Sequence, residues 1–90
     1  MTSSPKLVLD GEAVDTLLVL PPAARRRILS VLEQLRHERP RTTEDFSETD
    51  LAGRHISVKA VRPVLIRYWL DAAVDEFRVT RITVVKPWNR

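Results

Sequence analysis

The chain has 90 residues, enough for one domain with a single modest core. It is 43% hydrophobic and 30% charged, as soluble globular proteins are, and no apolar run approaches the roughly 18 residues that a membrane-spanning helix needs. There is no cysteine, which excludes disulfides and thiol chemistry. The two histidines, at positions 37 and 55, lack the spacing of metal ligands. We therefore expect one cytoplasmic domain over residues 1–90, with no metal and no small-molecule cofactor.

The net charge of +3 fits an acidic partner, such as a nucleic acid or an acidic protein segment.

From the N-terminus, the mostly apolar run from Lys6 to Leu9 predicts a short strand. Asp10 suits the N-cap of a helix that continues to about Leu20, and Glu12 suits the positive end of its dipole. The apolar side of this helix would consist of three aliphatic residues, Val14, Leu17 and Leu18.

A second helix is predicted from Pro22, because the first turn of a helix does not need the N–H that proline lacks. Four aliphatic residues share one side of it, Ile28, Val31, Leu32 and Leu35. Pro40 would end the helix after Arg39. The two helices, separated by a tight turn, are expected to form a hairpin that covers a sheet. The acidic and polar segment from 41 to 50 is expected to be a loop.

The last third of the chain predicts three strands, at residues 55–61, 64–70 and 77–85, all rich in β-branched and aromatic residues. Their connections are too short for a crossover helix, so neighbouring strands must be antiparallel. In the third strand the apolar parity changes near Thr80 and Arg81. A β-bulge would explain this change, and so would a strand that is buried on both faces.

Alternation in the first of these strands sorts its side chains by face. Ile56, Val58 and Ala60 share one parity, and we expect them to face the helices. His55, Ser57 and Lys59 share the other. Lys59 is therefore expected on the open face of the sheet. There it would join Arg67, Arg81 and Lys86 in a cluster of the size of a phosphate group.

Several short motifs follow one another in a specific order and spacing: Leu20-Pro21, Arg27-Ile28, Leu32-x-x-Leu35, Pro40, Asp45-Phe46 and Leu51-x-Gly53. Together they resemble the RelE/ParE superfamily of bacterial type II toxins, over nearly the full length of the chain. The resemblance implies an α+β domain of order βααβββ, with a helical hairpin packed on one face of a twisted antiparallel sheet. It also implies a cognate antitoxin encoded nearby.

Two activities are implied by the same resemblance. RelE-like toxins cleave mRNA in the ribosome without a cofactor, using Lys, Arg and Tyr on the open face and near the C-terminus. ParE-like toxins inhibit DNA gyrase and are not enzymes. The alternative is a non-toxic protein-binding module on the same scaffold. Leu65 and Pro87 depart from the family pattern, because arginine is familiar at the first position and arginine or histidine is frequent at the second.

RNA cleavage needs a base for the 2′-hydroxyl, donors for the phosphate and an acid for the leaving oxygen. The candidate catalytic residues are Lys59, Arg67 and Arg81, with His55 as a further candidate base. The candidate nucleic-acid-binding residues are Lys59, Arg81, Lys86 and Arg90.

An antitoxin has two candidate binding surfaces. An acidic tail would bind the cations Lys59 and Arg81. An amphipathic segment would instead bind the outer groove of the helical hairpin, near Val14 and Leu18.

Overall fold

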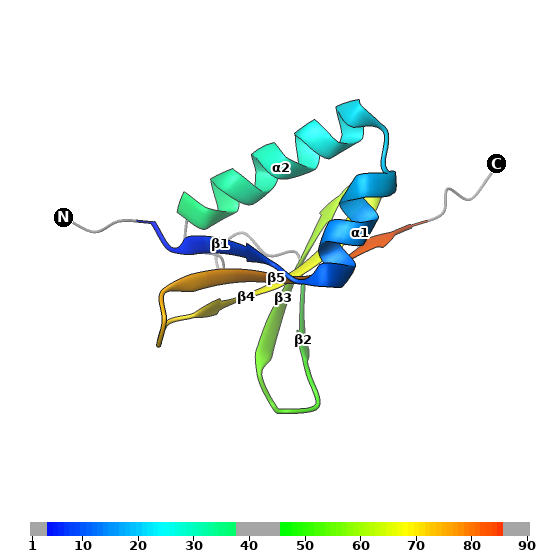
Figure 1. The fold of residues 1–90 in the computed structure, drawn as a ribbon. Coiled ribbons are helices and arrows are strands. Elements are labelled where there is room, and N and C mark those ends of the chain that lie inside the picture. Colours follow the sequence, from blue (N-terminus) through cyan, green and yellow to red (C-terminus); the bar gives the residue numbers. More distant parts are fainter. Residues whose placement is uncertain (1–3, 38–45, 86–90) are drawn as a thin grey trace.

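The computed structural model describes residues 4–37 and 46–85. Two helices and five strands follow one another in the order β1 (Lys6–Leu9), α1 (Gly11–Val19), α2 (Pro22–His37), β2 (Phe46–Thr49), β3 (His55–Val61), β4 (Val64–Asp71) and β5 (Glu76–Val84). The strands form one sheet in the order β1-β5-β4-β3-β2. Both helices lie on the same side of it (Figure 1). The predicted α+β class is confirmed.

The pairing of the sheet is mixed rather than wholly antiparallel. Strands β2 to β5 form an antiparallel meander, as their short connections require. Strand β1, by contrast, pairs in parallel with β5. The prediction of an antiparallel sheet was therefore wrong for β1. Strands β1 and β5 are far apart in the sequence, so no short connection constrains their relative direction.

The predicted loop at residues 41–50 is partly wrong, because Phe46–Thr49 form strand β2. This strand pairs antiparallel with β3, and Thr49 lies opposite His55. It is a short edge strand with a charged residue, Glu48, and such strands need no apolar alternation. The predicted helix stop at Pro40 lies outside the described residues.

The second helix has the predicted apolar side, since Ile28, Leu32 and Leu35 are buried and Val31 packs against them. The first helix is rotated relative to the prediction. Ala13 and Leu17 are buried, whereas Val14 is 37% exposed and Leu18 is 65% exposed. Burying the small Ala13 lets α1 approach strand β5 closely, which turns Val14 and Leu18 outward. The exposed side of α1 therefore carries the larger aliphatic residues.

The core lies between the helices and one face of the sheet, which we call the helix face. Strands β4 and β5 contribute six buried side chains to it, Val64, Ile66, Tyr68, Phe77, Val79 and Ile82. The rings of Tyr68 and Phe77 have centroids 5.1 Å apart and are tilted by 47°. We call the opposite face, which carries Arg67 and Arg81, the open face. Among the described residues, no helix is both long enough and apolar enough to cross a membrane.

Candidate functional site

Strand β4 sorts its side chains strictly by face. Ile66 and Tyr68 are buried in the core, so Arg67 between them lies on the open face. Directly opposite residues on antiparallel strands point to the same side, and Arg67 lies opposite Arg81 of β5. The two arginines therefore converge on the open face, as predicted.

A β-bulge at Thr80 gives Arg81 this position. Tyr68 pairs with Val79 and Arg67 pairs with Arg81, so Thr80 is the extra residue on β5. In a regular ladder, Arg81 would instead lie opposite Ile66 and point into the core. The bulge turns Arg81 to the open face and Ile82 into the core. Of the two explanations for the parity change, the structure confirms the bulge.

Lys59 does not join these arginines. It lies opposite Ile66 of β4, and its half-buried side chain is therefore on the helix face. His55 and Ser57 share its parity, and Ser57 is buried opposite Tyr68. The prediction that Lys59 faces away from the helices was wrong. The predicted cluster of Lys59 with Arg67 and Arg81 does not form.

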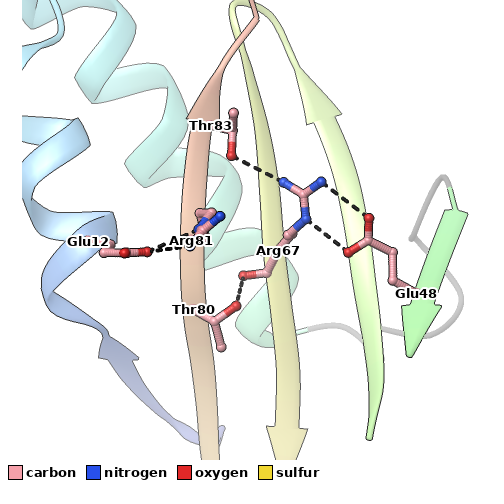
Figure 2. A network of polar contacts seen from close by, with 6 residues as sticks. All are labelled: Glu12, Glu48, Arg67, Thr80, Arg81 and Thr83. Carbon is pink, nitrogen blue, oxygen red and sulfur yellow. Dashed lines mark hydrogen bonds and ion pairs between the residues drawn. The ribbon is translucent and has the colours of Figure 1, made fainter. Parts of the chain in front are cut away.

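Each of the three guanidinium nitrogens of Arg67 donates a hydrogen bond (Figure 2). Its Nε and Nη2 donate to the two carboxylate oxygens of Glu48 on β2, at 3.0 and 3.2 Å. Its Nη1 donates to Thr83 Oγ1 at 3.1 Å. The paired hydrogen bonds from Arg67 hold the pKa of Glu48 below its ordinary value, against a smaller opposing effect of burial. Glu48 is therefore ionised at neutral pH.

Arg81 has a carboxylate of its own, from the other end of the chain. Its Nε lies 3.0 Å and its Nη2 2.9 Å from Glu12 Oε2, in the first turn of α1. The helix can reach β5 there because β1 pairs with β5 only as far as Val79. Across the open face, the four charged side chains form a row, Glu48, Arg67, Arg81 and Glu12.

The row explains how two arginines can be direct cross-strand neighbours. Like charges at such positions destabilise a sheet, and here each positive charge has a carboxylate on its outer side. The pairs are partly exposed, so each one stabilises the fold only modestly. The row is a balanced arrangement of charge rather than a free cationic patch.

A third arginine closes one end of the site. The guanidinium of Arg54 lies 4.6 Å from the ring centroid of Trp69. Asp50 fixes the turn before β3 by accepting hydrogen bonds from the backbone N–H groups of Ala52 and Arg54 and from Arg54 Nε. The backbone hydrogen bond from Arg54 is the largest of the effects that lower the pKa of Asp50.

These groups line an open groove of about 580 Å³ on the open face. Four carboxylates and three guanidinium groups surround it, together with Ile56, Leu51 and two threonines. Within residues 4–37 and 46–85, no three His, Asp or Glu side chains form a group that could hold a metal ion. The chemistry that the groove offers is proton acceptance by carboxylates and anion binding by arginines.

The remaining predicted residues have varied positions. Val14 and Leu18 are exposed on α1, and His55 is exposed at the start of β3. Lys86 and Arg90 lie outside the described residues. Sequence reasoning missed Glu48 and treated Glu12 only as a helix-dipole residue. Their partners are 19 and 69 residues away in sequence, and no local pattern relates such positions.

Comparison with solved structures finds the same fold in proteins of low sequence identity. The RelE–RelB complex of Pyrococcus horikoshii OT3 contains a chain of TM-score 0.75 and 16% identity, and the match covers 94% of this chain and 99% of that one. The toxin–antitoxin complex RelBE2 of Mycobacterium tuberculosis gives 0.71 and 17%, covering 91% and 99%. The intact Escherichia coli RelBE complex gives 0.70 and 13%, covering 92% and 99%.

This chain therefore shares the fold of the matched chains in these RelE–RelB complexes, over nearly their whole length. The expected resemblance is confirmed at the level of the fold. No family model matches the sequence, and no curated protein does.

Proposed function

We propose that this chain is the toxin of a type II toxin–antitoxin module and that an antitoxin encoded nearby neutralises it. One observation carries the proposal. The fold matches three chains from RelE–RelB type complexes, covering 91% to 94% of this chain and 99% of each of those. Fold alone does not define activity, which depends on the side chains of the open face.

Ribosome-dependent mRNA cleavage is the activity that the open face supports best. The ionised carboxylate of Glu48 would accept the proton of the 2′-hydroxyl once the phosphate draws Arg67 away from it, because the hydrogen bonds from Arg67 lower the pKa of Glu48 and so weaken it as a base. Arg67, hydrogen-bonded to the same carboxylate, would then donate to the phosphate as negative charge develops. Arg81, its cross-strand neighbour, would bind a second phosphate oxygen.

The acid for the leaving oxygen is a separate question. Tyr68 is the one tyrosine of the sequence, and it is buried in the core with no exposed surface. The alternation of β3 directs the side chains of His55 and Lys59 to the helix face, away from the groove. Lys86 and Arg90 lie outside the described residues and stay predictions for binding RNA, so water would protonate the leaving oxygen.

Gyrase inhibition is the second candidate, and a different surface favours it. Helix α1 exposes three aliphatic side chains, Val14, Leu18 and Val19, at 37%, 65% and 79%. An apolar helix side of this kind fits a protein partner, and the predicted antitoxin would compete for the same residues. A non-toxic binding module on this scaffold would use the same surface.

The first experiment is induction of the gene in its native host, with and without its neighbouring gene. We expect growth arrest that co-expression of the neighbour relieves. Harmless overproduction of the folded protein would contradict the proposal and favour the non-toxic module.

Two variants then separate the activities. Glu48→Gln keeps the size of the side chain and removes the proton acceptor, so it should abolish mRNA cleavage and growth arrest. Leu18→Asp should leave mRNA cleavage intact and weaken antitoxin binding. If growth arrest survives Glu48→Gln but is lost in Leu18→Asp, and purified gyrase is inhibited, the gyrase mode replaces RNA cleavage.

A further inference from the structure

The ion pair between Glu12 and Arg81 joins the sheet to a helix, whereas the pair between Glu48 and Arg67 joins two strands of the sheet. Glu48 is on β2 and Arg67 is on β4, within the same meander, and Thr83 holds the guanidinium as well. Arg81 instead reaches past the edge of the sheet to a helix. Among the described residues, Glu12 is the acceptor that its guanidinium contacts.

The position of Arg81 on the open face is built into the fold. The bulge at Thr80 directs it there, opposite Arg67. Two guanidinium groups side by side on a rigid sheet would bind a phosphodiester well, since arginine matches the geometry of phosphate oxygens. With Arg81 turned to Glu12, however, this pair of arginines is electrically compensated.

Glu12 is suited to hold Arg81 in this way. It lies in the first turn of α1, where the helix dipole favours a negative charge. Yet the pair is exposed, with 58% of the Arg81 side chain and 65% of the Glu12 side chain accessible to solvent. Exposed pairs are weak, so a multiply charged anion can displace the carboxylate.

We propose that Glu12 is a built-in counter-ion that withholds Arg81 from phosphodiester ligands on the open face, so that the free chain binds nucleic acid only weakly. The inference rests on the proposed function, because it concerns regulation of the face that would act on RNA. A phosphate group that reaches the groove competes with Glu12 for Arg81. Because Glu12 must be displaced before Arg81 can bind a phosphate, the open face would bind an extended polyanion in preference to isolated phosphate.

The test measures binding of the full chain to a single-stranded RNA oligonucleotide over a series of salt concentrations, with thermal unfolding as the check on folding. Glu12→Gln should bind about threefold to fivefold more tightly than the unmodified chain, as expected for one released exposed ion pair. Its plot of log affinity against log salt should be steeper by about 0.7, the slope of one more phosphate contact on a single strand.

Asp15→Asn is the matched control. Asp15 is an exposed carboxylate on the same helix, and it lines a second hollow, between α1 and β5, to which Glu12 and Arg81 also contribute. The change in net charge is therefore identical. Arg81→Ala in the Glu12→Gln background is the second control, because it should remove the gain. An Arg81-dependent gain that Asp15→Asn does not reproduce supports the inference.

Three results would overturn it: no gain in Glu12→Gln, an equal gain in Asp15→Asn, or a gain that persists without Arg81. Growth arrest of cells that produce the unmodified chain is scored separately. A failure of the counter-ion inference therefore leaves that assay unchanged, whereas a failure of the proposed function appears as harmless overproduction.

Discussion

The two faces of one sheet differ in what holds their side chains in place. On the helix face, Ile66 and the ring of Tyr68 are buried in the core, where close packing holds them in place. On the open face, Arg67, between them in sequence, is held by three hydrogen bonds and remains partly exposed. Apolar burial thus supplies the stability, and directional polar contacts position the groups that can do chemistry. The pleat of β4 separates the two roles by a single residue.

Inserting an alanine between Arg81 and Ile82 should break this separation most severely. With the added residue, either Ile82 or the pair Phe77 and Val79 must leave the core, because one half of β5 would turn its faces over. We expect the insertion variant to lose cooperative thermal unfolding. Thr80→Ala keeps the chain length and loses only the hydrogen bond to the Arg67 carbonyl, at a cost of about 1 kcal/mol. Similar behaviour of the two variants would mean that β5 does not depend on its register to sort its side chains by face.

Substitutions at neighbouring positions of β4 compare the faces directly. Ile66→Ala leaves a cavity in the core and should lower the free energy of unfolding by about 2–5 kcal/mol. Leu65→Ala, one residue earlier on the half-buried open face, should cost clearly less. Urea denaturation of both variants measures the difference. Equal costs would mean that the open face is also covered.

The turn between β2 and β3 shapes the end of the groove, and Gly53 tests its backbone. Gly53 has a φ of 81°, and a Cβ there would meet no atom within 4 Å. Gly53→Ala should therefore cost roughly 1–2 kcal/mol from backbone strain alone. Gly11→Ala, at the start of α1 and equally unobstructed, should be neutral or stabilising by up to about 1 kcal/mol. A tolerated Gly53→Ala would show that the turn adapts.

The smallest effect concerns the pair of Glu48 and Arg67. Because the pKa of Glu48 is lowered in the folded chain, the pair stabilises the fold fully above the ordinary carboxyl pKa. This contribution disappears as the pH falls through the lowered pKa. A double-mutant cycle of Glu48→Gln and Arg67→Ala should give a coupling of about 0.2–1 kcal/mol at neutral pH. The coupling should vanish in acid, and an unchanged coupling there would rule out the ion pair as its source.

Much of the fold could be predicted from the sequence. The aliphatic period of α2 identified Ile28, Leu32 and Leu35 as core residues, because a 3.6-residue repeat has one interpretation on a helix. Short connections fixed the antiparallel meander. The parity change near Thr80 marked the position of the bulge, although a strand buried on both faces explained the change equally well. These features depend on residues that are close together in sequence.

The candidate site was harder to predict. Alternation correctly divided the side chains of β3 into two sets that point to opposite faces of the sheet. It did not show which set faces the helices, so Lys59 was assigned to the wrong face. Ile56 and Val58 are buried on the open face, next to Glu48 and Arg67. The aliphatic parts of long charged side chains can cover apolar neighbours, as a packed helix does on the other face. Apolar character therefore did not distinguish the two faces.

The most direct test of the open face as the active surface compares two double variants for growth arrest and for thermal unfolding. Arg67→Ala with Arg81→Ala removes both arginines of the open face. Arg26→Ala with Lys59→Ala removes the same charge from an exposed position of α2 and from the helix face of β3. We expect the first variant to be folded and harmless and the second to arrest growth. A folded Arg67→Ala, Arg81→Ala variant that still arrests growth would contradict a role for the open face.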